Sequence, residues 1–306
     1  MSLGVLNNIA AIYAENNLNS TQAGLQTTLQ QLSSGSRINS GADDAAGLSL
    51  ADGLLANSAA LTQSSANASE GVGFLQVADG ALSQVTNLLN RAVTLATEAS
   101  NGTLNATQDT AANSEFQSIL DEIGNIGSST TYNGQQIFGA AAPTVIYTGD
   151  GTAGGGSTDS ISLNPLSSAS IGDTTGSGGL VYTSGGGTAT STLVYTPVAA
   201  DVSNLSAASL ATQAGAETAL GDVYTAVGDV AAERGYLGSQ INTLNAAANV
   251  ESTQQENVAS AENSIQATDY GAASSNLSKY EILSQTGISA LAQANSVQQE
   301  VLKLLQ

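Results

Sequence analysis

Histidine and cysteine are both absent from this chain of 306 residues, and their absence removes most catalytic chemistry. Without cysteine there is no disulfide framework, no thiolate metal site and no cysteine nucleophile. Without histidine the chain lacks the usual general base, the commonest metal ligand and the Ser-His-Asp arrangement. We therefore expect no enzyme, no bound cofactor and no metal site.

Basic residues are almost as scarce. Five Lys and Arg stand against 25 Asp and Glu, which gives a net charge of −20. The five are scattered along the chain as Arg37, Arg91, Arg234, Lys279 and Lys303. Nucleic-acid binding and docking on an anionic membrane surface both need clustered Lys and Arg. We expect neither kind of partner.

Long uninterrupted apolar runs are missing too. No stretch approaches the ~18 consecutive apolar residues that a membrane-spanning helix needs. The first residues also differ from a secretory signal, because no basic side chain precedes the apolar run and Asn7, Asn8 and Glu15 interrupt it. If the protein leaves the cell, we expect export without a cleaved signal peptide.

Apolar residues recur instead at helical spacing near both ends of the chain. The stripe at one end includes Leu3, Leu6, Ile9, Leu25, Leu29 and Leu32, and the stripe at the other includes Leu277, Ile288, Leu291, Val301, Leu302 and Leu305. Steps of mostly three, four or seven residues indicate an apolar face on an α-helix. Neither face can be covered by its own helix. We predict terminal helices that pair as a coiled coil and then pack against other copies.

The region between the ends divides by composition. All three prolines and a dense run of glycines lie within 139–200. Short β-type runs at 144–148, 180–183 and 192–196 predict a small β-rich or loop-rich insert there. The flanks, 42–138 and 201–264, carry apolar residues at helical spacing over lengths typical of a rod of long helices. The predicted fold class is mainly α.

A hairpin is expected near 130–138, where the helical pattern of the first flank ends. The segment Tyr132-Asn133-Gly134-Gln135 places Asn-Gly between β-type residues. Asn133 and Gly134 tolerate the two positive φ angles of a type I′ turn. We assign the segment a structural role.

A polar linker separates the first two predicted helices. Its notable residues are Gly35, Arg37, Asn39, Gly41, Asp43 and Asp44. Arg37 either makes a contact within the assembly or is solvated. We favour a contact, because an isolated cation on so acidic a chain should find carboxylates. Asp43 and Asp44 could cap the next helix or bind a cation; capping is the better reading, because no third ligand is near.

Several of these segments resemble bacterial flagellin. The N-terminal likeness rests on LSSGSRINSGADDAAGLSLAD at 32–52 and on TTYNGQQIF at 130–138. The C-terminal likeness rests on ERGYLGSQINTL at 233–244 and on the segment from 262 to 305. The matches cover roughly 1–138 and 205–306, in order along the chain. The resemblance therefore includes both helical arms.

The resemblance implies an architecture and a function. Residues 1–41 and 265–306 would form the inner coiled coil of a filament, 42–138 and 201–264 a helical rod with a hairpin, and 139–200 a small outer domain. The chain would be an extracellular structural subunit that self-assembles into the helical flagellar filament for motility. Implied partners are an export chaperone and the filament cap and hook-junction proteins.

The resemblance also implies an innate-receptor surface. In some flagellins, the positions that match Arg91, Leu95 and Glu115 contact a Toll-like receptor. Val93 and Thr94 depart from the family's usual Arg and Glu in this stretch. We favour the interpretation in which Leu95 and its neighbours form the core of the rod.

Two alternative functions remain open at this point. A hook–filament junction protein shares the same terminal pattern but would add only a few copies to a structure. A filament subunit could also carry an adhesive outer domain in 139–200. Self-assembly without a hook partner would separate the first alternative from flagellin.

Overall fold

The computed structural model describes residues 8–138, 144–149, 158–161, 163, 166–167, 182–183 and 205–304. Of the predicted sites, Leu3, Leu6 and Leu305 lie outside the described residues, as do the β-type run 192–196 and most of the insert 139–200. The chain forms two compact units. We call Met1–Ala56 with Asn257–Gln306 the terminal unit and Asn57–Glu256 the central unit.

The division between units does not coincide with the polar linker. Helix α2 spans Ala45–Ser100 and helix α4 spans Gln213–Gln266, so both continue through the boundary. The resemblance implies boundaries at 41/42 and 264/265. The first turns of α2 belong with the terminal unit, in which Ile38 and Ala51 are buried.

The central unit is built from long helices with a heptad spacing of buried residues. Helix α3, Ala106–Ser129, follows α2 and opens with a capping box between Asn105 and Gln108. Alternate steps of three and four along α2 keep one face turned to its neighbours. The buried positions on that face are Leu61, Ser64, Ala68, Gly71, Leu75, Ala78, Leu82, Val85, Leu89, Ala92, Ala96 and Ala99.

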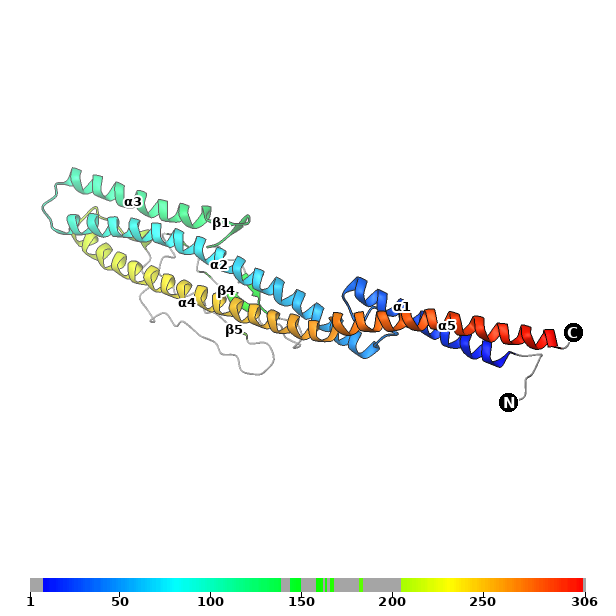
Figure 1. Ribbon diagram of the computed structural model, residues 1–306. Coiled ribbons are helices and arrows are strands. Elements are labelled where there is room, and N and C mark those ends of the chain that lie inside the picture. Colours follow the sequence, from blue (N-terminus) through cyan, green and yellow to red (C-terminus); the bar gives the residue numbers. More distant parts are fainter. Residues whose placement is uncertain are drawn as a thin grey trace. The chain divides into compact units, whose positions relative to one another are not determined.

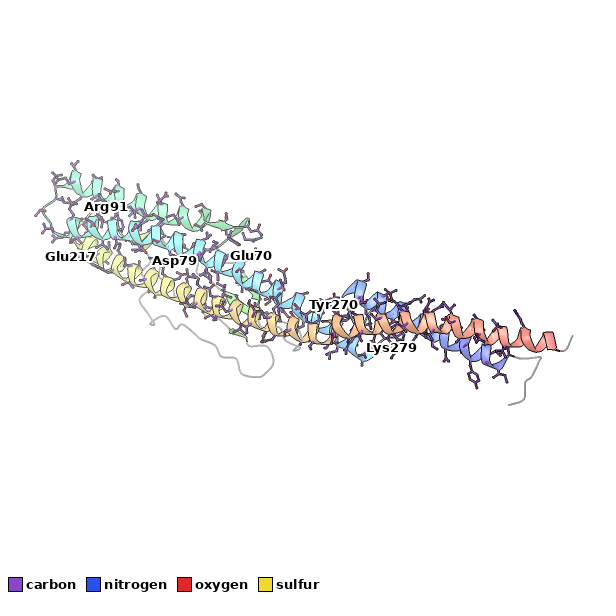
Figure 2. All side chains as sticks on the ribbon, viewed as in Figure 1. Glu70, Asp79, Arg91, Glu217, Tyr270 and Lys279 are labelled. Atoms are coloured by element: carbon purple, nitrogen blue, oxygen red, sulfur yellow. The ribbon has the colours of Figure 1, made fainter. Side chains whose placement is uncertain are left out.

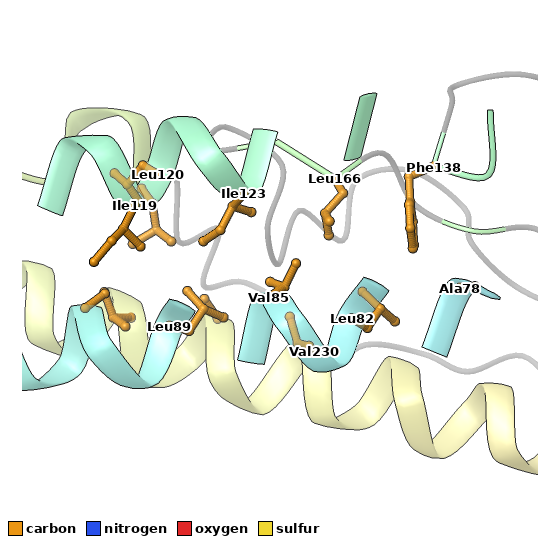
Figure 3. Packing of buried hydrophobic residues seen from close by; sticks show 14 of the residues in the cluster. Ala78, Leu82, Val85, Leu89, Ile119, Leu120, Ile123, Phe138, Leu166 and Val230 are labelled. Atoms are coloured by element: carbon orange, nitrogen blue, oxygen red, sulfur yellow. The ribbon is translucent and has the colours of Figure 1, made fainter. Parts of the chain in front are cut away.

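The core of this unit joins α2, α3 and α4. In Figure 3, Ile119 and Ile123 of α3 point toward α2, where Leu89 is fully buried. Helix α4 runs antiparallel to α2, because Arg234 contacts Asp79 while Glu251 contacts Ser64. Many of the shared core residues are alanines, which allow the helices to approach closely. The predicted rod of long helices is thus present (Figure 1).

The expected hairpin follows α3. Strands β1, Thr131–Tyr132, and β2, Gln135–Gln136, pair in an antiparallel register. Asn133 and Gly134 have φ angles of 50° and 77°, as a type I′ turn requires. The ring of Tyr132 meets that of Phe74 on α2 edge-to-face, with centroids 5.8 Å apart. This contact fastens the hairpin to the rod.

A three-stranded antiparallel sheet lies in the insert region. Its order is β3, Thr144–Tyr147, then β4, Thr158–Ile161, then β5, Tyr182–Thr183. The runs at 144–148 and 180–183 predicted β3 and β5. Strand β4 was missed, because Thr-Asp-Ser-Ile has little β-type character; its Asp159 and Ile161 are nevertheless both buried. A short 3-10 helix, Leu205–Ala207, precedes α4.

The terminal unit holds α1, Ile9–Ser34, and α5, Tyr270–Leu304, together with the ends of α2 and α4. Within the described ranges, no helix combines the length and apolar character required to cross a membrane.

Candidate assembly interface

Helices α1 and α5 lie side by side and run in opposite directions. At one end of the pair, the Asn8 side chain donates to the carbonyl of Ala294 at 3.0 Å. At the other end, Ser36 forms an antiparallel bridge with Ala267. The side-chain oxygen of Asn8 also accepts from the Ala11 N–H and so caps α1. One residue thus begins the helix and fixes its register on the partner.

The seam between the two helices has a strict heptad pattern. On both helices the residues turned to the seam alternate in steps of three and four, the spacing of a coiled coil. On α1 these residues are Ala11, Ala14, Leu18, Thr21, Leu25, Thr28 and Leu32. On α5 they are Ala273, Leu277, Tyr280, Ser284, Gly287, Leu291 and Ala294. Most are half-buried, so two helices alone leave the seam partly open to solvent.

Small residues set the spacing of this seam. A Cβ on Gly24 would lie 2.7 Å from the Tyr280 ring, and one on Gly287 would lie 3.3 Å from the Leu18 side chain. Thr28, which is 5% exposed, turns its hydroxyl back to the Gly24 carbonyl. Large side chains on one helix therefore fill the space left by small ones on the other.

The polar linker closes the end of the pair. Gly35 ends α1 in the left-handed conformation, with φ at 73°, and its N–H bonds to the Gln31 carbonyl. The Arg37 guanidinium donates a hydrogen bond to the Ile265 carbonyl at 2.9 Å. The backbone N–H of Arg37 donates to the Gln266 carbonyl. We had expected Arg37 to meet a carboxylate, but it meets backbone carbonyls in the last turn of α4. The negative end of that helix dipole attracts the cation.

The two aspartates of the linker have different tasks. Asp44 accepts from the Gly47 N–H at 2.8 Å and so caps the start of α2. Asp43 turns back and accepts from the backbone N–H groups of Asn39 and Ser40 and from the Ser40 hydroxyl. These hydrogen bonds, with that from Asn39 the largest, lower the pKa of Asp43. Only Asp44 is a helix cap; Asp43 holds the loop.

Large apolar side chains on the outer faces of the pair remain uncovered. We call them the outward apolar set: Ile9, Ile12, Tyr13, Leu29, Ile282, Leu283, Ile288 and Val297, each between 42% and 68% exposed. A groove of about 530 Å³ lies beside this set, lined by residues of both helices that include Leu18 and Tyr280. Apolar side chains in this number on weakly charged helices mark a surface for another protein.

The predicted interface residues fall into two groups. Leu25, Leu32, Leu277 and Leu291 lie in the seam between α1 and α5, whereas Ile9, Leu29 and Ile288 belong to the outward apolar set. Val301 and Leu302 lie within α5. The sequence prediction had placed all positions of each helix on a single apolar stripe, without separating the seam from the outer face.

Several residues of the pair were missed as interface positions. Thr21, Thr28, Ser284 and Gly287 occupy the seam although none is a large apolar residue. The steps of three and four residues that run through Leu18 could have identified them. A search for large apolar side chains alone does not find them.

Arg91, Leu95 and Glu115, the residues matched to a receptor surface, differ in their exposure to solvent. Arg91 on α2 pairs with Glu115 on α3 at 2.7 Å, and both side chains are about half exposed. Arg91 lies where α2 runs beside α3 (Figure 2). Leu95 is 3% exposed and packs in the core of the central unit. Leu95 therefore forms part of the core of the central unit, the interpretation that the sequence favoured.

Within the described part of the chain, no group of three or more acidic side chains is placed to hold a metal ion. Paired terminal helices with an uncovered apolar face define instead a protein built to assemble with other proteins.

Comparisons with known proteins identify the family. The model of the bacterial flagellin N-terminal helical region matches residues 5–142, and that of the C-terminal helical region matches residues 220–305. Together they cover more than half of the chain. The flagellin of Listeria monocytogenes is 30% identical over 97% of this chain and 98% of its own length. The chain belongs to the bacterial flagellin family, the structural subunits of the flagellar filament.

Other relatives match smaller parts of this chain. A flagellin of Salmonella muenchen is 36% identical over 54% of this chain, and the match spans 32% of that protein. The crystal structure of Bacillus cereus flagellin aligns with a TM-score of 0.44 and 27% identity, over 60% of this chain and 88% of that one. None of these comparisons favours the junction-protein or adhesin alternatives.

Proposed function

We propose that the α1–α5 pair is the element through which copies of this chain assemble into a filament, and that the outward apolar set is the surface buried between them. The observation that carries the proposal is the exposure of this set on two helices already paired with each other. Ile12 is 52% exposed, Tyr13 68% and Ile282 67%. A second copy offers the same kind of surface in return.

The energetics favour this use of the set. Full burial of one large apolar side chain stabilises by about 1.5–3 kcal/mol. Association of two proteins costs about 4–15 kcal/mol in lost freedom and ordering. Because these side chains are 42–68% exposed, each has roughly half of that stabilisation left to gain. One or two residues would not offset the cost of association, whereas burial of most of the set gives a stabilisation of the same order.

The scarcity of charge on the two helices supports the same use. The only charged residue of α1 is Glu15. Helix α5 has Lys279 and Glu281 in its first half and Glu300 and Lys303 near its end. Burial of an unpaired charge is costly, so helices destined for a protein interior carry few.

Growth into a filament requires a heterologous contact, in which different surfaces of two copies meet. A heterologous contact whose rotation does not close adds copies without limit and produces a helical tube. The predicted core residues of the seam then hold each copy together, and the outward apolar set joins it to the next.

We propose further partners, which the resemblance to the family suggests. An export chaperone would cover the uncovered face of α5 before assembly, and cap and hook-junction proteins would bind the same helical surfaces at the filament ends. Export would proceed without a cleaved signal peptide.

A Toll-like receptor would contact the exposed Arg91–Glu115 pair on α2 and α3. The protein's role is structural, without catalysis.

Single substitutions in the outward apolar set test the proposal. We expect Ile288→Asp to reduce seeded filament growth at least tenfold, because it places a charge in the buried contact. Ile288→Leu keeps the apolar volume and serves as the matched control. Elongation is measured by electron microscopy on seeds of wild-type filament.

The fold of each variant is checked by circular dichroism and by its unfolding midpoint. Ile288 is 51% exposed, so the aspartate should leave the isolated subunit folded. Normal growth of the aspartate variant would contradict the assignment of this face to the filament contact.

A further inference from the structure

A buried glutamate in the central unit has no role in the assembly described above. Glu251 on α4 is 5% exposed. Its Oε1 atom accepts a hydrogen bond from the Ser64 hydroxyl on α2 at 2.6 Å. Its Oε2 atom is buried and has no hydrogen-bond partner within the part of the chain that the structure describes. An ionised carboxylate in this position would leave charge on an oxygen that nothing solvates.

Ser64 extends this contact to a third segment. The backbone N–H of Gly149, two residues after β3, donates to the Ser64 oxygen at 2.5 Å. Asn67, one turn further along α2, donates to the carbonyl of Tyr147 at 3.2 Å. The Ser64 hydroxyl therefore accepts from Gly149 and donates to Glu251, which fixes the direction of both hydrogen bonds. This relay ties the segment 144–149 to α2 and α4.

No cation neutralises Glu251 in the described residues. Arg91 pairs with Glu115 and Arg234 pairs with Asp79. The titratable group that acts on Glu251 from the sheet is Asp159 of β4, which is itself 5% exposed. A second acid of the same sign favours the neutral form of Glu251.

We propose that Glu251 carries a proton on Oε2 in the folded central unit, and that loss of this proton releases the segment 144–149 from α2 and α4. The device is a pH-dependent latch on the first strand of the insert. In the neutral acid, Oε1 remains the acceptor for Ser64, so the relay is complete. In the carboxylate, the buried charge draws Glu251 toward water and the relay to Gly149 breaks.

The direction of the pH effect follows from the raised pKa of Glu251 in the folded unit. Burial raises the pKa of Glu251; the Ser64 hydrogen bond opposes this and the Asp159 charge adds to it. A group whose pKa is raised on folding contributes stability below its unfolded pKa and loses it as pH rises through the folded pKa. The latch is therefore closed in acid and opens as the pH rises.

Hydrogen exchange of the Gly149 amide in the full-length monomer tests the latch. After correction for the intrinsic base-catalysed rate, we expect the opening equilibrium in the wild type to grow by up to about tenfold per pH unit between the pKa of Glu251 in the open state and its raised folded pKa, and to level off above the folded pKa. Glu251→Gln keeps the acceptor for Ser64 and cannot ionise, so its opening should not depend on pH. Glu256→Gln, at an exposed position on the same helix, is the matched control and should behave as the wild type.

Three outcomes would overturn the proposal. The first is equal pH dependence in the wild type and in Glu251→Gln. The second is a dependence that survives in Glu251→Gln but disappears in Asp159→Asn, which would assign the proton to the strand. The third is closure of the wild-type latch at high pH by added Ca²⁺ and not by a monovalent salt, which would assign a cation to Oε2.

Discussion

Single glycines decide how the terminal helices end and meet. Gly35 adopts a φ of 73°, which L-residues with a side chain rarely take, and a Cβ there would also lie 2.8 Å from the Tyr270 hydroxyl. Gly24 has ordinary helical geometry, but its missing side chain makes room for Tyr280. The first glycine is required by the backbone and the second by the neighbour.

A pair of glycine substitutions should separate these requirements from helix propensity. Gly35→Ala is expected to destabilise the terminal unit by about 1–2 kcal/mol, the cost of a left-handed residue with a Cβ. Gly53→Ala, inside α2 with open space around it, should instead stabilise by about 0.5–1 kcal/mol. Urea unfolding followed by circular dichroism measures both. The same sign for the two variants would contradict the role given to Gly35.

At the scale of elements, heptad seams organise both units. The buried face of α2 keeps its three-four spacing from Leu61 to Ala99. The seams are narrow and rich in alanine, so few large side chains carry most of the apolar burial. Leu82 and Leu89 are fully buried on this face, whereas Val77 on the same helix is 40% exposed.

Truncation on the two faces of α2 should therefore have unequal effects. Leu89→Ala is expected to cost about 2–5 kcal/mol through lost burial and the cavity left behind. Val77→Ala should change the free energy of unfolding by no more than about 0.5 kcal/mol. Denaturant unfolding of the central unit reports both values. A cost for Leu89→Ala as small as that for Val77→Ala would show that α2 does not form the core described.

Helical spacing in the sequence was sufficient to predict these elements but not their partners. Leu25 and Leu29 both belong to an apolar stripe, yet Leu25 faces α5 and Leu29 faces outward. The periodicity of apolar residues predicts which side chains are buried, but it does not predict which element buries them. Thr28 was missed for the opposite reason, because it is polar and still turned to the seam.

Single polar residues were the least predictable. Glu251 has the sequence context of a solvated helical glutamate, and only the fold reveals that Ser64 and the segment after β3 cover it. Arg37 was expected to meet a carboxylate and meets the carbonyl of Ile265. Both contacts join residues far apart in the sequence, which no local pattern encodes.

At the scale of the whole molecule, charge and apolar surface act against each other. The net charge of −20 makes copies repel one another. The outward apolar set favours their association. Added salt screens the repulsion, and a salt such as sulfate also strengthens apolar burial because it is excluded from protein surfaces. Assembly should therefore depend on both the concentration and the kind of salt.

Negative-stain electron microscopy of the purified chain, with short filament seeds and with or without ammonium sulfate, tests the central claim most directly. We predict long, uniform tubes that elongate from the seeds and grow faster in sulfate. Monomers or short rings under all conditions, with seeds supplied, would contradict open-ended assembly through the terminal helices and would favour a junction protein.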